Sequence, residues 1–179
     1  MAAVEKIAII GLDCAEPSLV FEKWWDILPN MRRLCETGRY GNLESSMPPI
    51  TVPAWSCMMS SKDPGTLGIY GFRNRKDHTY DGLTIATSLA VKERRLWDYL
   101  DLKGQSSIVI GVPGTFPITK PVRGCMICGF LAPDAQSDYT YPKELKAEIR
   151  DLVGEYLVDV KGFRTDDKQW LLDQIYDMT

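Results

Sequence analysis

Three short apolar runs constrain the fold of this chain most strongly. They lie at Lys6–Asp13, Ser106–Val112 and Gly124–Leu131. Short continuous runs of this kind are typical of buried strands in a parallel sheet that is covered on both faces. A further segment, Arg39–Ser46, alternates enough between apolar and polar residues to predict another short strand.

Helical patterns alternate with these runs. Pro17 suits the first turn of a helix, which Pro29 and Asn30 interrupt. Further helices are predicted at Met31–Thr37, Ala54–Ser61, Val91–Leu102 and Tyr141–Val153, and a last one after the capping residues Thr165–Asp167. Residues 62–81, rich in Gly, Pro and charge, are expected to form a loop. The alternation predicts an α/β fold, with a mainly parallel sheet and helices on both faces.

Length and charge limit the number of domains in this chain and the classes of partner that it can bind. The 179 residues, 45% of them hydrophobic, suit a single α/β domain over residues 1–179. The formal net charge of -3 argues against binding a nucleic acid polymer, and the absence of a long apolar run argues against a membrane span. The five cysteines are an odd number and lack the spacing of a disulfide framework, which favours reduced thiols and a cytoplasmic location.

Asp13 is the first candidate for chemistry, because it stands at the carboxyl end of the first predicted strand. Ligands of open α/β sheets gather at those ends, so its carboxylate is well placed to hold a metal cation. A carboxylate in this position also caps a following helix by accepting backbone N–H hydrogen bonds. Position alone leaves both interpretations open.

Thr51 is the second candidate. It lies between Pro49 and Pro53 and precedes a predicted helix. The N–H groups and the dipole at a helix N-terminus favour a bound phosphoryl group and an activated hydroxyl. An ordinary N-cap threonine is the structural alternative.

Three other features could be either functional or purely structural. Arg73 and Arg75 could bind a phosphate group of a substrate, although charged loops are usually only solvated. Cys125 and Cys128 have CxxC spacing but lie in a predicted strand, where their side chains point to opposite faces, so a core role is favoured over a metal or redox site. His78 is the single histidine of the chain and is expected in a surface loop.

A series of motifs then covers almost the whole chain. The motifs are Ile9-Ile10-Gly11-Leu12-Asp13, Leu28-Pro29-Asn30-Met31-Arg32-Arg33-Leu34, Pro48-Pro49-Ile50-Thr51-Val52-Pro53-Ala54-Trp55, Asp63-Pro64-Gly65-Thr66-Leu67-Gly68-Ile69-Tyr70-Gly71-Phe72, Val112-Pro113-Gly114-Thr115-Phe116-Pro117 and Gly129-Phe130-Leu131-Ala132-Pro133. In order and spacing they resemble the type I phosphodiesterase/nucleotide pyrophosphatase family of the alkaline phosphatase superfamily.

The resemblance implies an alkaline-phosphatase-like core and a metal-dependent hydrolase of phosphodiester or pyrophosphate bonds, acting on a small phosphorylated substrate. In that family a threonine forms a covalent phospho-threonine, and two divalent metals, usually Zn²⁺, bind the reacting oxygens. Thr51 matches the nucleophile, which also contacts metal, and Asp13 matches the first metal-binding acid.

The chain also departs from the family pattern. The remaining aspartate and histidine ligands of the family lie further along the chain than Thr179, so the resemblance implies the N-terminal part of a larger catalytic domain with an incomplete metal site. Such a truncated chain is expected to be inactive alone, and to self-associate or require a complementing C-terminal portion. Ala54 and Leu67 stand where relatives often have asparagine and histidine. The alternative is therefore a non-catalytic α/β domain that binds a partner or a phosphorylated ligand.

Overall fold

The chain divides into two compact units. The computed structural model describes residues 4–129, 131–160 and 162–178. The first unit comprises Met1–Glu44 and the second Ser45–Thr179. The interpretation of residues 1–179 as a single domain stays a prediction.

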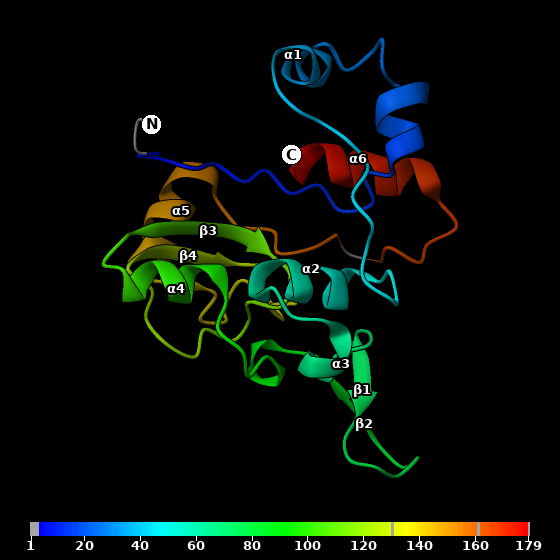
Figure 1. Ribbon diagram of the computed structural model, residues 1–179. Helices are drawn as coiled ribbons and strands as arrows, with labels where there is room; N and C mark the ends of the chain where they lie inside the picture. The colour runs from blue at the N-terminus through cyan, green and yellow to red at the C-terminus, as the bar shows by residue number, and fades with distance from the viewer. Residues whose placement is uncertain (1–3, 130, 161, 179) are drawn as a thin grey trace. The chain divides into compact units, whose positions relative to one another are not determined.

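Two helices form the first unit. A π-helix, η1, covers Ser18–Lys23, and α1 covers Pro29–Thr37 (Figure 1). The carboxylate of Glu16 accepts hydrogen bonds from the backbone N–H groups of Ser18 and Leu19, and so occupies donors that a helix start leaves without an acceptor. The helices predicted around these positions are confirmed, and Pro29 is the first residue of α1.

Two strands predicted for the N-terminal region are absent. Residues 4–12 form no strand, and the side chains of Ile7, Ile10 and Leu12 are exposed, so the prediction of a buried strand at Lys6–Asp13 is wrong. Arg39–Ser46 forms no strand either. An apolar or alternating segment becomes a strand only when a neighbouring strand completes its hydrogen bonds, and a local pattern contains no information on that neighbour.

Most helices of the second unit were expected from the sequence, but the helix at Pro64–Leu67 lies in the predicted loop of residues 62–81, and the helix expected from Tyr141 begins at Leu145. The helices of this unit are α2 at Thr51–Ser60, α3 at Pro64–Leu67, a 3-10 helix η2 at Ser88–Ala90, α4 at Leu96–Leu102, α5 at Leu145–Val153 and α6 at Lys168–Met178. The start of α4 lies five residues later than predicted. Arg95 is extended there, and the Asp98 carboxylate accepts a hydrogen bond from the Arg95 N–H at 2.8 Å, which sets the helix start at Leu96.

Two small sheets complete the second unit. One contains β3 (Ser107–Val112), β4 (Gly124–Cys128) and β5 (Thr140–Tyr141) in that order. The other is a hairpin of β1 (Arg73–Arg75) and β2 (Leu83–Ile85), where the sequence predicted only loop up to Asp81. Among the described strands only β3 and β4 pair in parallel, so the fold is mixed α/β and a mainly parallel sheet is not shown. Phe130, within the predicted third strand, lies outside the described residues.

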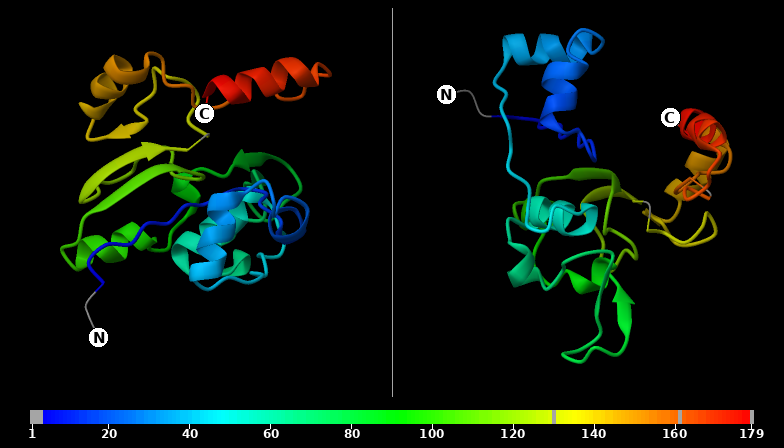
Figure 2. Two further views of the ribbon diagram at one scale, coloured as in Figure 1. Left: turned by 90° about the horizontal axis from the view of Figure 1, so that it is seen from above. Right: turned by 90° about the vertical axis from the view of Figure 1, so that its right-hand side faces the viewer.

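The core of the second unit lies on one face of the three-stranded sheet. α4 lies against β3 and α5 beside β5 (Figures 1 and 2). Val109 and Met126 pack there against Trp97, whereas Ile108 on the opposite face is 74% exposed. The predicted strand at Ser106–Val112 is therefore confirmed, but it is covered on one face and not on both.

Candidate active site

Thr51 is the first residue of α2. Ile50 before it is extended, with φ -115° and ψ 145°, and the upstream peptide bond between Met47 and Pro48 is cis. The side chain of Thr51 is half-buried, so it is partly open to a ligand. Because the first N–H groups of a helix lie outside its own hydrogen-bond ladder, the end of α2 at which Thr51 lies favours an anionic group. The helix N-terminus predicted at this threonine is confirmed.

Two contacts position α2. Val52, in its first turn, is buried in a cluster with Leu67 and Ile69. The turn after β3 lies against the middle of the helix, where a Cβ atom on Gly114 would lie 3.8 Å from the Oγ of Ser56. The turn at the carboxyl end of β3, where ligands of α/β sheets usually bind, therefore lies beside the helix that begins at Thr51.

The titratable groups near α2 favour their ordinary charge states. Hydrogen bonds from the hydroxyl and backbone N–H of Thr66 lower the pKa of Asp63, which caps α3. Burial raises the pKa of the Cys57 thiol, and the negative charge of Asp63 raises it further. Cys57 is therefore a neutral thiol near neutral pH.

Asp13 lies in the first unit, in a turn and not at the end of a strand. Its carboxylate accepts a hydrogen bond from the N–H of Cys14, whose φ of 57° is left-handed. The residue that caps η1 is Glu16, whose pKa is lowered by hydrogen bonds from Ser18. The capping interpretation of Asp13 therefore does not describe this helix, and its role as a metal ligand stays a prediction. Thr51 belongs to the second unit.

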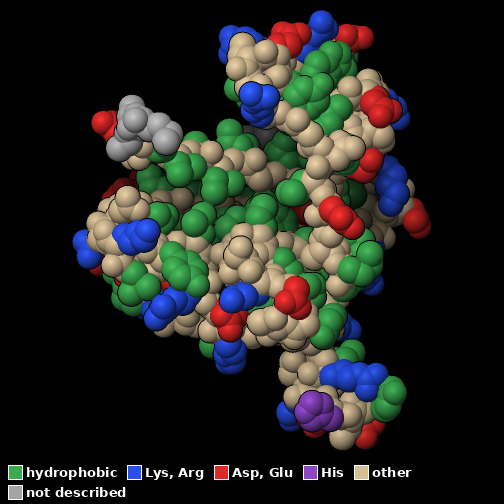
Figure 3. Space-filling model, in the orientation of Figure 1, with side chains coloured by type: hydrophobic (Ala, Val, Ile, Leu, Met, Phe, Trp, Pro, Cys, Tyr) green, Lys and Arg blue, Asp and Glu red, His purple; other side chains and the backbone are tan. Residues whose placement is uncertain are grey.

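Arg73 and Arg75 both lie on β1, in the hairpin. The guanidinium of Arg75 covers the ring of Tyr80 at 3.8 Å from the centroid, and it donates a hydrogen bond to the carbonyl oxygen of Thr79. These contacts occupy Arg75 within its own hairpin, and its role in substrate binding stays a prediction. His78 lies exposed in the hairpin loop, as predicted, and is the purple side chain in Figure 3.

The donors available for a metal are few. Within residues 4–129, 131–160 and 162–178, no three His, Cys, Asp or Glu side chains come together as a group that could hold a metal ion. Cys125 is half-buried and Cys128 is fully buried on β4, and the two form no disulfide. Burial raises the pKa of Cys128 to about 11. Cys128 packs in the core with Ala132 and Tyr139, as predicted, whereas Cys125 is only half-buried.

A group of cationic side chains was not among the residues predicted from the sequence. Lys146 and Arg150, four residues apart, lie on one side of α5, Lys143 lies in the turn before this helix, and all three line a pocket beside it. The spacing was the signal that could have revealed this group. The tyrosines that complete the pocket come from other segments and leave no such local pattern.

Comparison with known proteins identifies a family model that matches almost the whole chain. The model describes type I phosphodiesterase / nucleotide pyrophosphatase, and it matches residues 7–178. Searches of the curated proteins and of the solved structures found no match. None of the helices in the described residues is both long and apolar enough to cross a membrane.

Proposed function

This chain belongs to the type I phosphodiesterase/nucleotide pyrophosphatase family, and we propose that it supplies the nucleophile for hydrolysis of a phosphodiester or pyrophosphate bond. Thr51 is the nucleophile. The observation that carries this assignment is its position as the first, half-buried residue of α2.

The chemistry follows from that position. The Oγ of Thr51 forms a bond to phosphorus, the bond from phosphorus to the leaving oxygen breaks, and the oxygen leaves with the electron pair. Negative charge develops on the phosphoryl oxygens in this step. The positive end of α2 stabilises that charge, because helix N–H groups and the helix dipole both favour anions. Water then attacks phosphorus, the bond from phosphorus to Oγ breaks, Oγ regains a proton, and the product leaves as a phosphomonoester that keeps the second ester group of the substrate.

The family generally depends on divalent metals, and two Zn²⁺ ions are the proposed cofactors. Zn²⁺ takes about four protein ligands. The described residues contain no group of three His, Cys, Asp or Glu side chains that could bind Zn²⁺, so they do not complete such a site. Asp13 is proposed as one ligand. The other ligands would have to come from a complementing portion, so the chain alone is proposed to hydrolyse little or no substrate.

A hybrid enzyme tests the nucleophile. Residues 7–178 replace the matching segment of an active member of the family, and hydrolysis of bis(4-nitrophenyl) phosphate is measured with added Zn²⁺. We expect Thr51→Val to reduce the rate at least about 100-fold and Thr51→Ser to retain part of it, since serine keeps the hydroxyl. Thr84→Val, a change to an exposed threonine on β2, is the matched control. An active hybrid whose rate is unaffected by Thr51→Val would contradict the assignment.

The second candidate is a non-catalytic domain that binds a phosphorylated ligand, which the lack of a three-ligand group favours. An inactive but folded hybrid, with the circular dichroism and thermal unfolding of a native protein, would support this alternative. The isolated chain is assayed in parallel. Zn²⁺-dependent hydrolysis by the isolated chain that disappears in Thr51→Val would uphold the nucleophile and refute the need for complementation.

A further inference from the structure

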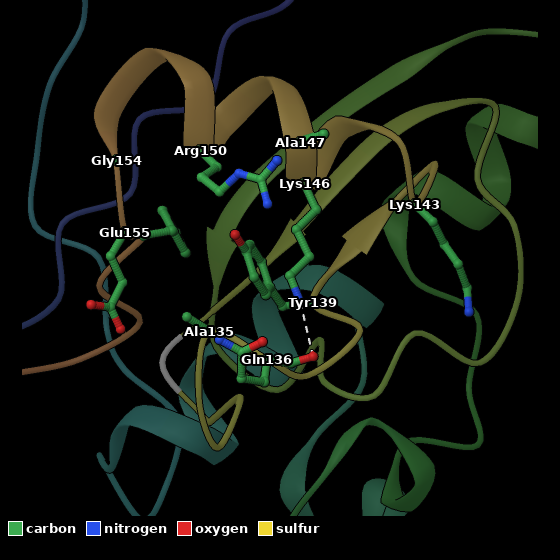
Figure 4. Close-up of a pocket in the computed structure, with 10 residues that line it drawn as sticks. Ala135, Gln136, Tyr139, Lys143, Lys146, Ala147, Arg150, Gly154 and Glu155 are labelled. Atoms are coloured by element: carbon green, nitrogen blue, oxygen red, sulfur yellow. Dashed lines mark hydrogen bonds between the residues drawn. The ribbon is translucent and has the colours of Figure 1, made fainter.

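A pocket of about 620 Å³ lies beside α5, and it contains none of the residues proposed for hydrolysis. Its volume is in the range of small-molecule sites in proteins. Gln136 and Tyr139 come from the segment before β5, Lys146 and Arg150 from α5, and Glu155 and Tyr156 from the segment after α5. Three separate segments therefore converge on one cavity (Figure 4).

Two stacked tyrosines form the rigid wall of this pocket. The rings of Tyr139 and Tyr156 lie 5.0 Å apart at an angle of 14°, and Tyr139 is only 2% exposed. Both rings pack in the cluster around Cys128. Burial raises the pKa of both phenols, so each keeps its proton and remains a neutral hydrogen-bond donor.

Lys146 is held in place on this wall. Its ammonium group donates hydrogen bonds to the carbonyl oxygens of Gln136 at 2.8 Å and Ser137 at 3.0 Å. It also lies 5.3 Å from the centroid of the Tyr139 ring. An ammonium group has three protons, so one donor remains in addition to these two bonds. Its ammonium group is thus held by carbonyl oxygens, and the carboxylates of Asp134 and Asp138 also lie within the range of its charge.

Arg150 supplies a second cation, one helical turn further along α5. The ion pair recorded for its guanidinium is a long one, 3.9 Å from Nε to the adjacent Asp151. Lys143 differs, because Asp138 binds it at 2.7 Å. Figure 4 shows Lys146 and Arg150 reaching toward Tyr139, while Lys143 extends away from them. The pocket therefore offers two cationic donor groups, in a chain whose net charge is -3.

Glu155 gives the pocket an acceptor. Figure 4 shows its carboxylate on the side of the pocket away from Lys143. A carboxylate repels a bare phosphate ion but accepts hydrogen bonds from hydroxyl groups. The guanidinium of Arg150 is suited to bind a phosphate group through two of its N–H groups. Arg150 therefore favours a phosphate group, and Glu155 favours hydroxyl groups of the same ligand.

We propose that this pocket binds a phosphomonoester whose organic part carries hydroxyl groups, which is the chemistry of a sugar phosphate. Arg150 and Lys146 bind the phosphate group, the phenols donate to the ligand, and Glu155 accepts from its hydroxyl groups. This site is separate from the one at Thr51, and its existence does not depend on the proposed hydrolysis.

Calorimetric titration of the chain with glucose 6-phosphate, inorganic phosphate and glucose tests the proposal. We expect glucose 6-phosphate to bind, inorganic phosphate to bind at least about tenfold more weakly, and glucose to give no signal. Equal affinity for phosphate and glucose 6-phosphate would remove the assigned role of the hydroxyl groups. No binding of glucose 6-phosphate would refute the proposal.

Variants test whether glucose 6-phosphate binding depends on charges in this pocket or on any positive charge of the protein. Arg150→Gln and Lys146→Gln should each weaken glucose 6-phosphate binding about tenfold or more, since each removes a charge-assisted hydrogen bond. Glu155→Gln should strengthen phosphate binding and reduce the preference for the sugar phosphate. Arg94→Gln, which removes an exposed charge elsewhere, is the matched control. An equal loss in Arg94→Gln and Arg150→Gln would overturn the proposal, and circular dichroism of each variant verifies that it is folded.

Discussion

The hydroxyl oxygen of Thr115 accepts a hydrogen bond from the backbone N–H of Gly129 at 3.0 Å. The same hydroxyl donates to the carbonyl oxygen of Val112 at 2.7 Å. One buried side chain therefore links the turn after β3 to the residue that follows β4. Because the turn after β3 approaches α2 at Ser56, this link also supports the position of the helix that begins at Thr51.

Replacing Thr115 by valine should destabilise the second unit. Valine has nearly the same shape, but it leaves the N–H of Gly129 and the carbonyl of Val112 without this partner. Unsatisfied buried groups of this kind cost about 1–3 kcal/mol each, so we expect the free energy of unfolding in urea to fall by about 2–3 kcal/mol. Thr84→Val, at an exposed position, should change it by less than about 0.5 kcal/mol. Similar values for the two variants would contradict the role assigned to the Thr115 hydroxyl.

Replacing Gly124 by alanine should also destabilise the fold, for a steric reason. Gly124 has φ 120°, and an added Cβ atom would lie 2.2 Å from the carbonyl oxygen of Ser107 on the neighbouring strand. The strands would have to separate locally, so we expect a loss of about 2–3 kcal/mol in thermal or urea unfolding. Gly71→Ala is the control, because the nearest atom to its added Cβ would be 3.9 Å away. An unchanged midpoint in Gly124→Ala would show that β3 and β4 do not approach each other in this way.

The buried thiol of Cys128 predicts a dependence of stability on pH. Its pKa is about 11 in the folded chain, against an ordinary value of 9.0, because burial disfavours the thiolate. Below pH 9 the Cys128 thiol keeps its proton in both the folded and the unfolded chain, so its ionisation takes nothing from the free energy of unfolding. Between about pH 9 and pH 11 only the unfolded chain loses the proton, so stability falls, by about 2–3 kcal/mol in total.

Urea unfolding of the native chain and of Cys128→Ala at several pH values checks this prediction. The alanine variant should be less stable at pH 8, and its stability should fall less steeply between pH 9 and pH 11. Cys125→Ala controls for the removal of a thiol from the same strand. Parallel pH curves for the native chain and Cys128→Ala would refute the assignment to this thiol.

Asp98 should contribute more to stability than the lysine that contacts it. Its buried carboxylate accepts a hydrogen bond from the N–H of Arg95 and forms an ion pair of 2.8 Å with Lys120. Asp98→Ala leaves that N–H at the start of α4 without its acceptor, so we expect a loss of about 2 kcal/mol in urea unfolding. Lys120 is more than half exposed, and Lys120→Ala should cost less than about 1 kcal/mol. A larger effect of Lys120→Ala would indicate that the ion pair, and not the helix cap, is the important interaction.

Local signals were sufficient for most helices. Pro29, Gly38 and Gly104 mark helix boundaries in the sequence, and the structure has helix ends at or next to these residues. Thr51 was likewise expected at a helix N-terminus and lies there. Such signals act within a few residues, through fixed φ angles and hydrogen bonds of the first and last turns, so they can be read without knowledge of the remaining chain.

Strand pairing could not be predicted from local signals in the same way. The run at Lys6–Asp13 looks as apolar as β3, yet only β3 forms a strand. β1 and β2 pair across a loop of polar residues that gave no strand signal. The stability of a strand depends on residues distant in sequence, because its hydrogen bonds and one of its faces are completed by other segments.

The amino-acid sequence by itself therefore determined the family, the helix that presents Thr51 and the opposite orientation of Cys125 and Cys128. These follow from motif order and from the periodicity of helices and strands, which are local properties. Only the tertiary structure decided that one face of β3 is covered, and that Lys146 and Arg150 meet Tyr139 and Tyr156 in one pocket. The physical reason is that burial and the convergence of side chains depend on how segments fold back on one another, even where, as in this pocket, they are close in the sequence.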